Sequence, residues 1–438
     1  MTRRPDVVLL ICDQMQAQRL GSGSPSLTPN LDALASAGAR LERSFCSNAQ
    51  CTPSRASLQT GLYPHEAGVM VIYGFGGHTG HLGAEHTTIA DAFRAAGYST
   101  ALFGKSHFGF PLSGLGYDAG IERGGGPSLA AVDRAITDDA VAYVEAHDRD
   151  RPMFLVVSWH QPHPPFEDVP DFLPRSGDVR IPESFGDDLS DRPAYQAERR
   201  AQPGGGYDEE TLRREQEQYL SMIAAMDHEV GRVTAALEAR GGQRVVAFTS
   251  DHGDLMGAHG LRLKGPLPYE ELYRVPLIVV APQVAAGSVV DALTVNVELP
   301  ATLMDLAGVP RPDGWPDRSL VPVLGGAPGA DRVFLEHYGA YWGFHPFRMI
   351  RTERHKYVRH YGPGEGDEEL YDLEEDPHER RNLAGDERFA PLAAQLRAEV
   401  DDWWRRTGGR DWEDYESDAF RLAGRDTLLQ DNELWAGT

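Results

Sequence analysis

Short apolar runs alternate along the chain with longer stretches in which apolar residues recur at helical spacing. The runs cover residues 7–11, 99–103, 154–158 and 245–249. Continuous apolar runs of this kind are typical of strands that are buried on both faces of a sheet. Buried strands that alternate with helices predict an α/β sandwich with a mostly parallel central sheet.

The predicted helices have recognisable first and last residues. Thr28 is the expected N-cap of one helix, Pro29 occupies its first turn, and Gly38 ends it. Another helix is expected over residues 89–96. The longest predicted helix covers residues 208–240, and its apolar face carries Tyr219, Ile223, Met226, Val230, Val233 and Leu237.

The pattern changes after residue 331 to short runs that are typical of antiparallel strands, followed by one helix. The predicted strands cover residues 333–336, 347–351 and 356–359, and the helix covers residues 390–404. We therefore expect an α/β domain over residues 1–330. Residues 331–438 are expected to form a C-terminal subdomain with a small antiparallel sheet, a packed helix and a terminal arm.

Two segments have weak patterning and leave alternatives open. Residues 170–207 are rich in Pro, Gly and Asp, and they form either a tolerated surface insertion or a wall of the substrate pocket. Residues 408–438 form either an arm that wraps a neighbouring subunit in a homo-oligomer or a cover over their own domain.

Composition and charge disfavour several classes of protein. The formal net charge is −24, from 66 acidic and 42 basic residues, and a strongly negative protein repels nucleic acid. The three cysteines, Cys12, Cys46 and Cys51, do not make a disulfide framework. The first apolar run is too short for a signal peptide, and no stretch approaches the roughly 20 residues that span a bilayer. We therefore predict a cytoplasmic protein that binds neither nucleic acid nor a membrane.

Polar side chains follow each of the predicted strands at the point where it ends. In chain order they are Asp13 and Gln14, Lys105 and His107, His160 and His163, and Asp251 and His252. Ligands of open α/β sheets bind beyond the carboxyl ends of the strands. The strand assignments therefore bring carboxylates, imidazoles, an amide and an ammonium group to one edge.

Four of these side chains suit a divalent cation. Asp13, Gln14, Asp251 and His252 offer oxygen ligands and one imidazole, which is a set that hard divalent cations accept. The simpler alternative is that the two aspartates cap the helices that follow their strands.

The run from Cys51 to Gly61 reads as one short helix with a reactive group at its start. Thr52 is the expected N-cap, Pro53 the first helical residue, and Gly61 the end. Cys51 then lies at a helix N-terminus, where unpaired backbone N–H groups favour an anion. The alternative for an isolated cysteine is a buried, inert side chain.

The pattern Cys-x-Pro-Ser-Arg-x4-Thr-Gly, which begins at Cys51, resembles the signature of the type I sulfatases of the alkaline phosphatase superfamily. Further resemblances are Gly-Lys-x-His at residues 104–107, the His-Pro element at residues 162–165, and residues 250–276 with Asp251, His252 and Lys264. The resemblance implies an alkaline phosphatase-like fold. It also implies that Cys51 is oxidised to formylglycine by a modifying enzyme that binds transiently, and that the hydrated aldehyde attacks the sulfur of a sulfate ester.

The family's functional residues carry over to matching positions of this chain. The implied cation is calcium, with manganese or magnesium as alternatives, and its ligands are Asp13, Gln14, Cys51, Asp251 and His252. The implied catalytic residues are Cys51, Arg55, Lys105, His107, His163 and Lys264.

Each implied catalytic residue has an expected part in the reaction. Arg55 would hold the hydrated aldehyde, and Lys105 and Lys264 would neutralise the sulfate. His163, helped by Lys264, would protonate the departing alcohol, and His107 would take a proton from the second hydroxyl of the hydrate. His160 and His259 would only line the pocket.

One departure from the commoner family pattern leaves the substrate open. Gln14 stands where many sulfatases have a second aspartate, and this Asp-Gln form resembles choline sulfatases and phosphonate monoester hydrolases. A phosphonate monoester or phosphodiester hydrolase is therefore an alternative to a sulfatase, and a non-catalytic anion-binding relative is another. Residues expected near the alcohol part of the substrate are 73–81, Tyr341, Trp342 and Phe344.

Overall fold

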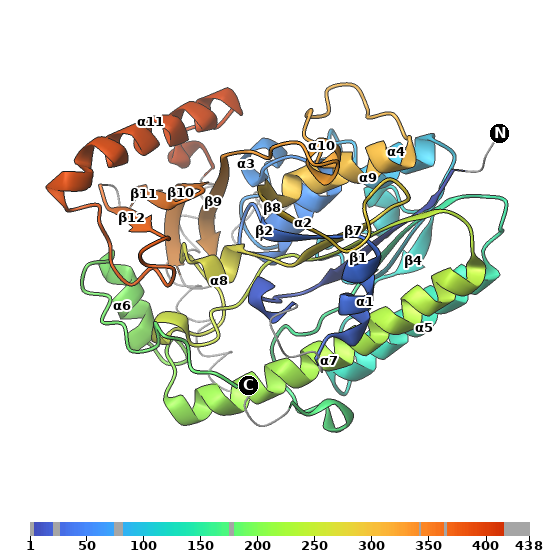
Figure 1. Ribbon diagram of the computed structural model, residues 1–438, viewed down its shortest axis with the longest axis horizontal. Helices are drawn as coiled ribbons and strands as arrows, with labels where there is room; N and C mark the ends of the chain where they lie inside the picture. Colours follow the sequence, from blue (N-terminus) through green and yellow to red (C-terminus); the bar gives the residue numbers. More distant parts are fainter. Residues whose placement is uncertain are drawn as a thin grey trace.

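An eight-stranded sheet runs through the middle of the molecule (Figure 1). The computed structural model describes residues 4–20, 27–73, 82–174, 179–340, 343–362 and 366–415. The strand order is β4-β3-β5-β1-β6-β7-β2-β8. All neighbours pair in parallel except β7, which runs antiparallel to both β6 and β2. The strands are β1 (Asp6–Cys12), β2 (Ala39–Phe45), β3 (Ser99–Gly104), β4 (Ala119–Ile121), β5 (Met153–Ser158), β6 (Arg244–Ser250), β7 (Leu277–Val280) and β8 (Ser288–Val295).

Helices cover both faces of this sheet, which is why its central strands are apolar throughout. Val7 and Leu9 of β1 belong to the core on the side of α2, α4 and α9, whereas Val8 and Leu10 belong to the core on the side of α1, α5 and α7. The helices before the second sheet are α1 (Pro29–Ala37), α2 (Cys51–Thr60), α3 (Pro64–Ala67), α4 (Ile89–Ala95), α5 (Leu129–Ala146), α6 (Ala194–Ala201), α7 (Glu209–Arg240), α8 (Glu270–Tyr273), α9 (Leu299–Ala307) and α10 (Val321–Leu324).

The second sheet is antiparallel, with the order β12-β11-β10-β9, and lies beside the first (Figure 1). Its strands are β9 (Arg332–Ala340), β10 (Gly343–Thr352), β11 (His355–His360) and β12 (Glu368–Asp372), and α11 (Ala390–Arg406) packs on it. One hydrophobic cluster joins the two sheets, because Phe45 of β2 packs in the same core as Leu335 of β9 and Trp403 of α11.

The predicted fold class is confirmed. Each predicted strand lies inside an observed one, and the predicted long helix is α7, for which the Asp208 side chain accepts a hydrogen bond from the Thr211 N–H as N-cap. The strands β2, β4, β7, β8 and β12 and the helices α3, α5, α6, α8, α9 and α10 were not predicted. The boundary at residues 330 and 331 stays a prediction, and residues 416–438 of the expected arm lie outside the described residues.

The interpretation of residues 170–207 as an aperiodic excursion is corrected in part. This segment contains α6, on which Gln196 and Arg199 are buried. Arg199 donates hydrogen bonds to the backbone carbonyls of Arg262 and Lys264. The segment is therefore packed against the loop that carries Lys264.

Within the part of the chain that the structure describes, no helix is both long enough and apolar enough to cross a membrane. The cytoplasmic location stays a prediction.

Candidate active site

The carboxyl ends of β3, β5, β1 and β6 lie next to one another, because these strands are consecutive neighbours in the sheet. Ile11 of β1 is in register with Ser158 of β5, and Cys12 with Ser250 of β6. The Asp13 N–H, just beyond β1, donates to the Gln161 carbonyl beyond β5. The expected convergence of polar strand ends at one edge is therefore present.

Cys51 is the first residue of α2, and this corrects the predicted start of the helix. Gln50, not Thr52, is the N-cap residue, with extended backbone angles, and its side chain makes no cap hydrogen bond. The Thr52 hydroxyl instead donates to the His107 carbonyl at 3.2 Å and accepts from the Tyr73 N–H at 2.9 Å. Gly61 ends the helix in the left-handed conformation with φ 69°, as expected.

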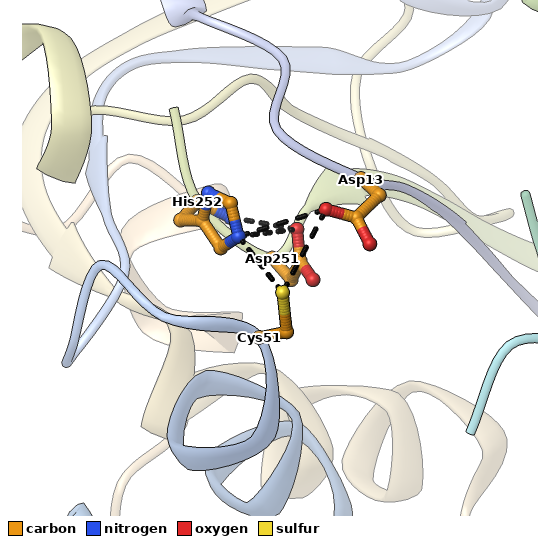
Figure 2. Close-up of side chains that lie close together, drawn as sticks. All are labelled: Asp13, Cys51, Asp251 and His252. Carbon is orange, nitrogen blue, oxygen red and sulfur yellow. Dashed lines mark hydrogen bonds and ion pairs between the residues drawn. The ribbon is translucent and has the colours of Figure 1, made fainter. Parts of the chain in front are cut away.

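Four buried side chains point toward one another at this edge (Figure 2). They are Asp13, Cys51, Asp251 and His252, and one ligand atom of each lies within 4.8 Å of all the others. The His252 Nε2 is 3.3 Å from the Cys51 Sγ, 3.6 Å from the Asp13 Oδ1 and 3.8 Å from the Asp251 Oδ1. Neither aspartate is a helix cap, because the N-caps of the nearest following helical turns are Gln16 and Gly257.

Arg55 holds the two carboxylates of this cluster in place. Its Nε donates to the Asp251 Oδ2 at 2.9 Å, and its Nη2 lies 3.4 Å from the Asp13 Oδ2. Its Nη1 donates to the Ser158 hydroxyl and to the Lys105 carbonyl. The guanidinium is thus directed to the two carboxylates, and its expected contact with the hydrated form of residue 51 stays a prediction.

Two lysines supply positive charge beside Cys51. The Lys264 Nζ lies 3.0 Å from the Cys51 Sγ, 2.9 Å from the Gln14 Oε1 and 3.1 Å from the His252 Nε2. The Lys105 Nζ forms an ion pair with the Asp13 carboxylate and lies 3.8 Å from the Cys51 Sγ. An ammonium group thus already occupies a place that the surrounding oxygen, sulfur and nitrogen atoms make favourable for a cation.

The positively charged side chains stabilise the ionised forms of Cys51 and Asp13 although both are buried. Burial alone would raise the pKa of the Cys51 thiol, but Lys105, Lys264 and His252 hold it well below its ordinary value. Burial and Cys51 likewise oppose ionisation of Asp13, whereas Lys105, His163 and Lys264 hold the pKa of this carboxyl below its usual range. The pocket is therefore suited to negative charge on residue 51 and on a bound ligand.

His107 and His163 lie beside Cys51 and interact with its side chain. The His163 Nδ1 lies 2.6 Å from the Pro164 carbonyl, which can only accept, so Nδ1 carries a proton. Burial and the nearby Lys264 lower the pKa of His163 to about 4. The imidazole is therefore neutral near pH 7, with Nε2 available to accept a proton.

The two histidines that were expected only to line the pocket are held by other carboxylates. The His160 Nδ1 lies 3.4 Å from Asp133, and the His259 Nδ1 lies 2.9 Å from Asp187. His259 also stacks on Tyr269, with ring centroids 3.7 Å apart.

The expected substrate-contacting segment lies mostly outside the described residues, namely residues 74–81 together with Tyr341 and Trp342. Phe344 is half-buried and packs edge-on against Tyr338, with ring centroids 5.0 Å apart.

Sequence reasoning missed several residues that support the site. The Asp254 carboxylate accepts a hydrogen bond from the Gln14 amide, and it lies within the sequence element that had drawn attention to Asp251. The Glu122 carboxylate accepts from the N–H groups of Ser106 and His107. Asp133, Glu122 and Arg199 are isolated polar residues, and no local sequence pattern marks them.

The sulfatase family model matches residues 5–309, which is more than half of the chain. The chain belongs to the sulfatase family. A second model, described as N-sulphoglucosamine sulphohydrolase, C-terminal, matches residues 257–406. The resemblance to sulfatases of the alkaline phosphatase superfamily is thereby confirmed, and the chain is a sulfuric ester hydrolase.

Individual relatives of this sulfatase differ in what their names say they act on. The choline-sulfatase of Rhizobium meliloti (strain 1021) is 29% identical over 459 residues, covering 91% of this chain and 86% of that protein. The solved structure of a 2-O GAG sulfatase gives a TM-score of 0.80 at 27% identity, covering 92% of each chain. The phosphonate monoester hydrolase of Agrobacterium radiobacter gives 0.74 at 25% identity, covering 92% of this chain and 96% of that one.

Proposed function

We propose that this sulfatase hydrolyses a small sulfate monoester to an alcohol and inorganic sulfate, with a formylglycine made from Cys51 and one divalent cation. The observation that carries the proposal is the buried convergence of Asp13, Asp251 and His252 on the Sγ of Cys51. The Sγ marks the position that the oxygens of the formylglycine hydrate would take.

The residues present fit a divalent cation. The Lys264 ammonium already contacts the Gln14 amide oxygen, the Cys51 Sγ and the His252 imidazole. The carboxylates of Asp13 and Asp251 lie within 4.8 Å of the ligand atoms of Cys51 and His252. Asp13, Gln14, Asp251, His252 and residue 51 would hold the cation. It would act there as a Lewis acid that neutralises charge on sulfate oxygens. Calcium is the first choice because oxygen ligands predominate, with manganese and magnesium as alternatives.

Formylglycine would supply a hydrate with two hydroxyl groups on one carbon, one to act as nucleophile and one to allow the aldehyde to form again. A coded cysteine or serine lacks the second hydroxyl. The change requires a modifying enzyme that meets the chain transiently. Cys51 has the position that such a nucleophile needs, at the N-terminus of α2 and between Lys105 and Lys264.

The two lysines and Arg55 would offset negative charge on the substrate and on the carboxylates of the site. Lys105 and Lys264 would stabilise the sulfate oxygens, whose charge changes during the reaction. Arg55 would act through Asp13 and Asp251, since it holds both carboxylates in the orientation seen in Figure 2.

The two histidines beside residue 51 would move protons. His163 would protonate the leaving alcohol. Its pKa of about 4 reflects burial and the charge of Lys264, and an anionic ester bound beside the lysines would offset that charge and raise the pKa. His107 would take the proton of the second hydroxyl.

The test of the proposal is chemical analysis of residue 51 together with activity. Protein made with a formylglycine-generating enzyme should show Cys51 converted to the aldehyde in peptide mass spectra and should cleave a sulfate monoester. Cys51→Ala should lose turnover, and removal of metal by a chelator should lower activity until calcium, manganese or magnesium is returned. Full activity of Cys51→Ala would contradict the mechanism. A control, Cys46→Ala, changes a buried cysteine that donates to the Leu272 carbonyl and should stay active.

A phosphonate monoester or phosphodiester hydrolase is the second candidate. Gln14, rather than aspartate, in the cation site and the similarity to the phosphonate monoester hydrolase of Agrobacterium radiobacter favour it. Parallel assays of a sulfate monoester, a phosphonate monoester and a phosphodiester with the same leaving group separate the two, by the ratio of kcat/KM values.

A further inference from the structure

The Gln14 side chain is held between an anion and a cation. Its Nε2 donates to the Asp254 Oδ2 at 2.5 Å, and its Oε1 accepts from the Lys264 Nζ at 2.9 Å. The Gln14 backbone is in the left-handed region with φ 74°, a conformation that is uncommon for residues other than glycine. Both the backbone and the side chain of Gln14 are therefore held by their surroundings in one particular orientation.

The two ends of a glutamine amide have nearly the same size but opposite chemistry. Only the oxygen can bind a metal cation, whereas the NH₂ group can only donate. A carboxylate beside one end accepts hydrogen bonds and therefore selects the NH₂ group for that side. Asp254 is placed to make this selection, so the Gln14 oxygen is turned toward the Lys264 ammonium, which in turn contacts Cys51 and His252.

Asp254 is itself fixed and fully buried. Its Oδ1 accepts from the Met256 N–H at 2.7 Å, and its backbone carbonyl accepts from the Gln16 Nε2 at 2.7 Å. On the other side, the Gln14 carbonyl accepts from the Tyr219 hydroxyl at 2.8 Å. Neither partner can turn without breaking another buried hydrogen bond, which would leave a polar group unpaired.

We propose that Asp254 is a positioning residue that sets the orientation of the Gln14 amide, so that its oxygen rather than its nitrogen faces the cation. The inference rests on the proposed cation site, and it concerns a residue that is not itself a ligand. Among the described residues, the cluster that could hold a metal consists of Asp13, Cys51, Asp251 and His252. Both oxygens of Asp254 are already used, by Gln14 and by Met256.

Exchanging the amide and the carboxylate between positions 14 and 254 separates the effect of side-chain orientation from the effect of net charge. In Asp254→Asn the new NH₂ group faces the Gln14 NH₂ group, so the glutamine turns and directs its nitrogen to the cation. In Gln14→Glu combined with Asp254→Asn, the hydrogen bond is reversed. The amide introduced at position 254 donates to the carboxylate introduced at position 14, and its oxygen still accepts from the Met256 N–H. The net charge of the pair is the same as in the starting protein.

The experiment measures calcium and magnesium binding to metal-free full-length protein by calorimetry, and thermal unfolding of the same samples without metal. Asp254→Asn should raise Kd at least about tenfold, the usual effect of losing an outer-shell partner, and the double variant should restore the starting affinity or exceed it. Without metal, both single variants should lower Tm, and the double variant should recover most of the loss.

Glu369→Gln is the matched control. Glu369 is a buried carboxylate that also accepts from a glutamine amide, from the Gln196 Nε2 at 3.0 Å, so its change should lower Tm and leave Kd unchanged. Unchanged cation affinity in Asp254→Asn, or no recovery in the double variant, overturns the proposal. If the starting protein binds no divalent cation, the proposed cation site fails by itself, and the Tm pattern of the metal-free variants still shows whether Asp254 orients Gln14.

Discussion

The Arg199 Nη2 donates to the backbone carbonyl of Lys264 at 2.8 Å, and to that of Arg262 at 2.6 Å. An arginine of α6 thus fixes the backbone of the loop from which Lys264 reaches Cys51. The sequence left this segment open as either a surface insertion or a wall of the pocket, and the contact shows that it supports the loop that carries Lys264.

Arg199→Met should lower kcat by roughly tenfold, with a smaller effect on KM. Loss of a buried donor that satisfies two carbonyls costs about 1–3 kcal/mol, and the resulting movement displaces the Lys264 ammonium. Steady-state kinetics over a range of sulfate ester concentrations up to saturation measure both kcat and KM. Arg213→Met is the control, because Arg213 is an exposed arginine that forms an ion pair with Glu209 of the same helix. An unchanged kcat in Arg199→Met would contradict the argument.

Glu122→Ala should lower kcat/KM by about tenfold, whereas Glu122→Gln should stay within about threefold of the starting enzyme. One oxygen of Glu122 accepts from the N–H groups of Ser106 and His107, and a glutamine oxygen can still accept both. His107 has φ 67°, so its backbone depends on such contacts. Equal kcat/KM values for the alanine and glutamine variants would show that Glu122 does not position His107.

Glu336→Ala should lower the free energy of unfolding by about 3 kcal/mol, because it leaves two buried hydrogen-bond donors of His65 without an acceptor, at about 1–3 kcal/mol each. Glu336 of β9 accepts from both the backbone N–H and the side chain of His65 in α3, and both side chains are buried. Urea unfolding measures the change. Glu85→Ala is the control, since Glu85 contacts His86 at 3.6 Å on the surface and should change stability by less than about 0.5 kcal/mol. A similar loss in both variants would contradict the prediction.

Stability should fall as the pH is lowered from about 6.5 toward 3, in part because of His337. Burial, with His345 and His360 nearby, lowers the pKa of His337 to about 3, so the unfolded chain binds a proton in this range that the folded protein does not. The free energy of unfolding therefore decreases as pH falls, by at most about 4 kcal/mol from this group at about 1.4 kcal/mol per pH unit.

His337→Phe should reduce this dependence on pH, because phenylalanine does not titrate and keeps the stacking on Phe347. Urea unfolding of both proteins between pH 7.5 and 4 measures it. Parallel curves for the two proteins would mean that His337 is not the group responsible.

Much of the fold could be predicted from the sequence, because burial on both faces leaves a direct mark on it. The apolar runs at β1, β3, β5 and β6 can only be satisfied between two layers of helices. The sequence does not indicate the direction of β7, because Leu277–Val280 is a short apolar run that fits a sheet in either direction. The neighbours β6 and β2, which are far from each other in sequence, decide it.

Most residues of the candidate site could be found because they follow a strand or open a helix, whereas Arg55 and Lys264 were indicated by the resemblance to the sulfatase signature. The residues that support them could not, because their partners are distant in sequence: Arg199 is 65 positions from Lys264, and Asp254 is 240 from Gln14. The predicted start of α2 was wrong for the same reason, namely partners that are distant in sequence. Thr52 looked like an N-cap, but its hydroxyl is used by His107 and Tyr73, which come from later in the chain.

Only 1% of the Cys51 surface is exposed in the folded protein, and every residue of α2 is buried. If Cys51 is converted to formylglycine as proposed, the modifying enzyme must therefore reach the thiol before the chain closes around it. Modification and folding would then compete in time for each newly made molecule. A chain that folds first would be stable, indistinguishable in shape and permanently inactive, so the active fraction of a preparation would be fixed during synthesis and could not be raised by treating the purified protein.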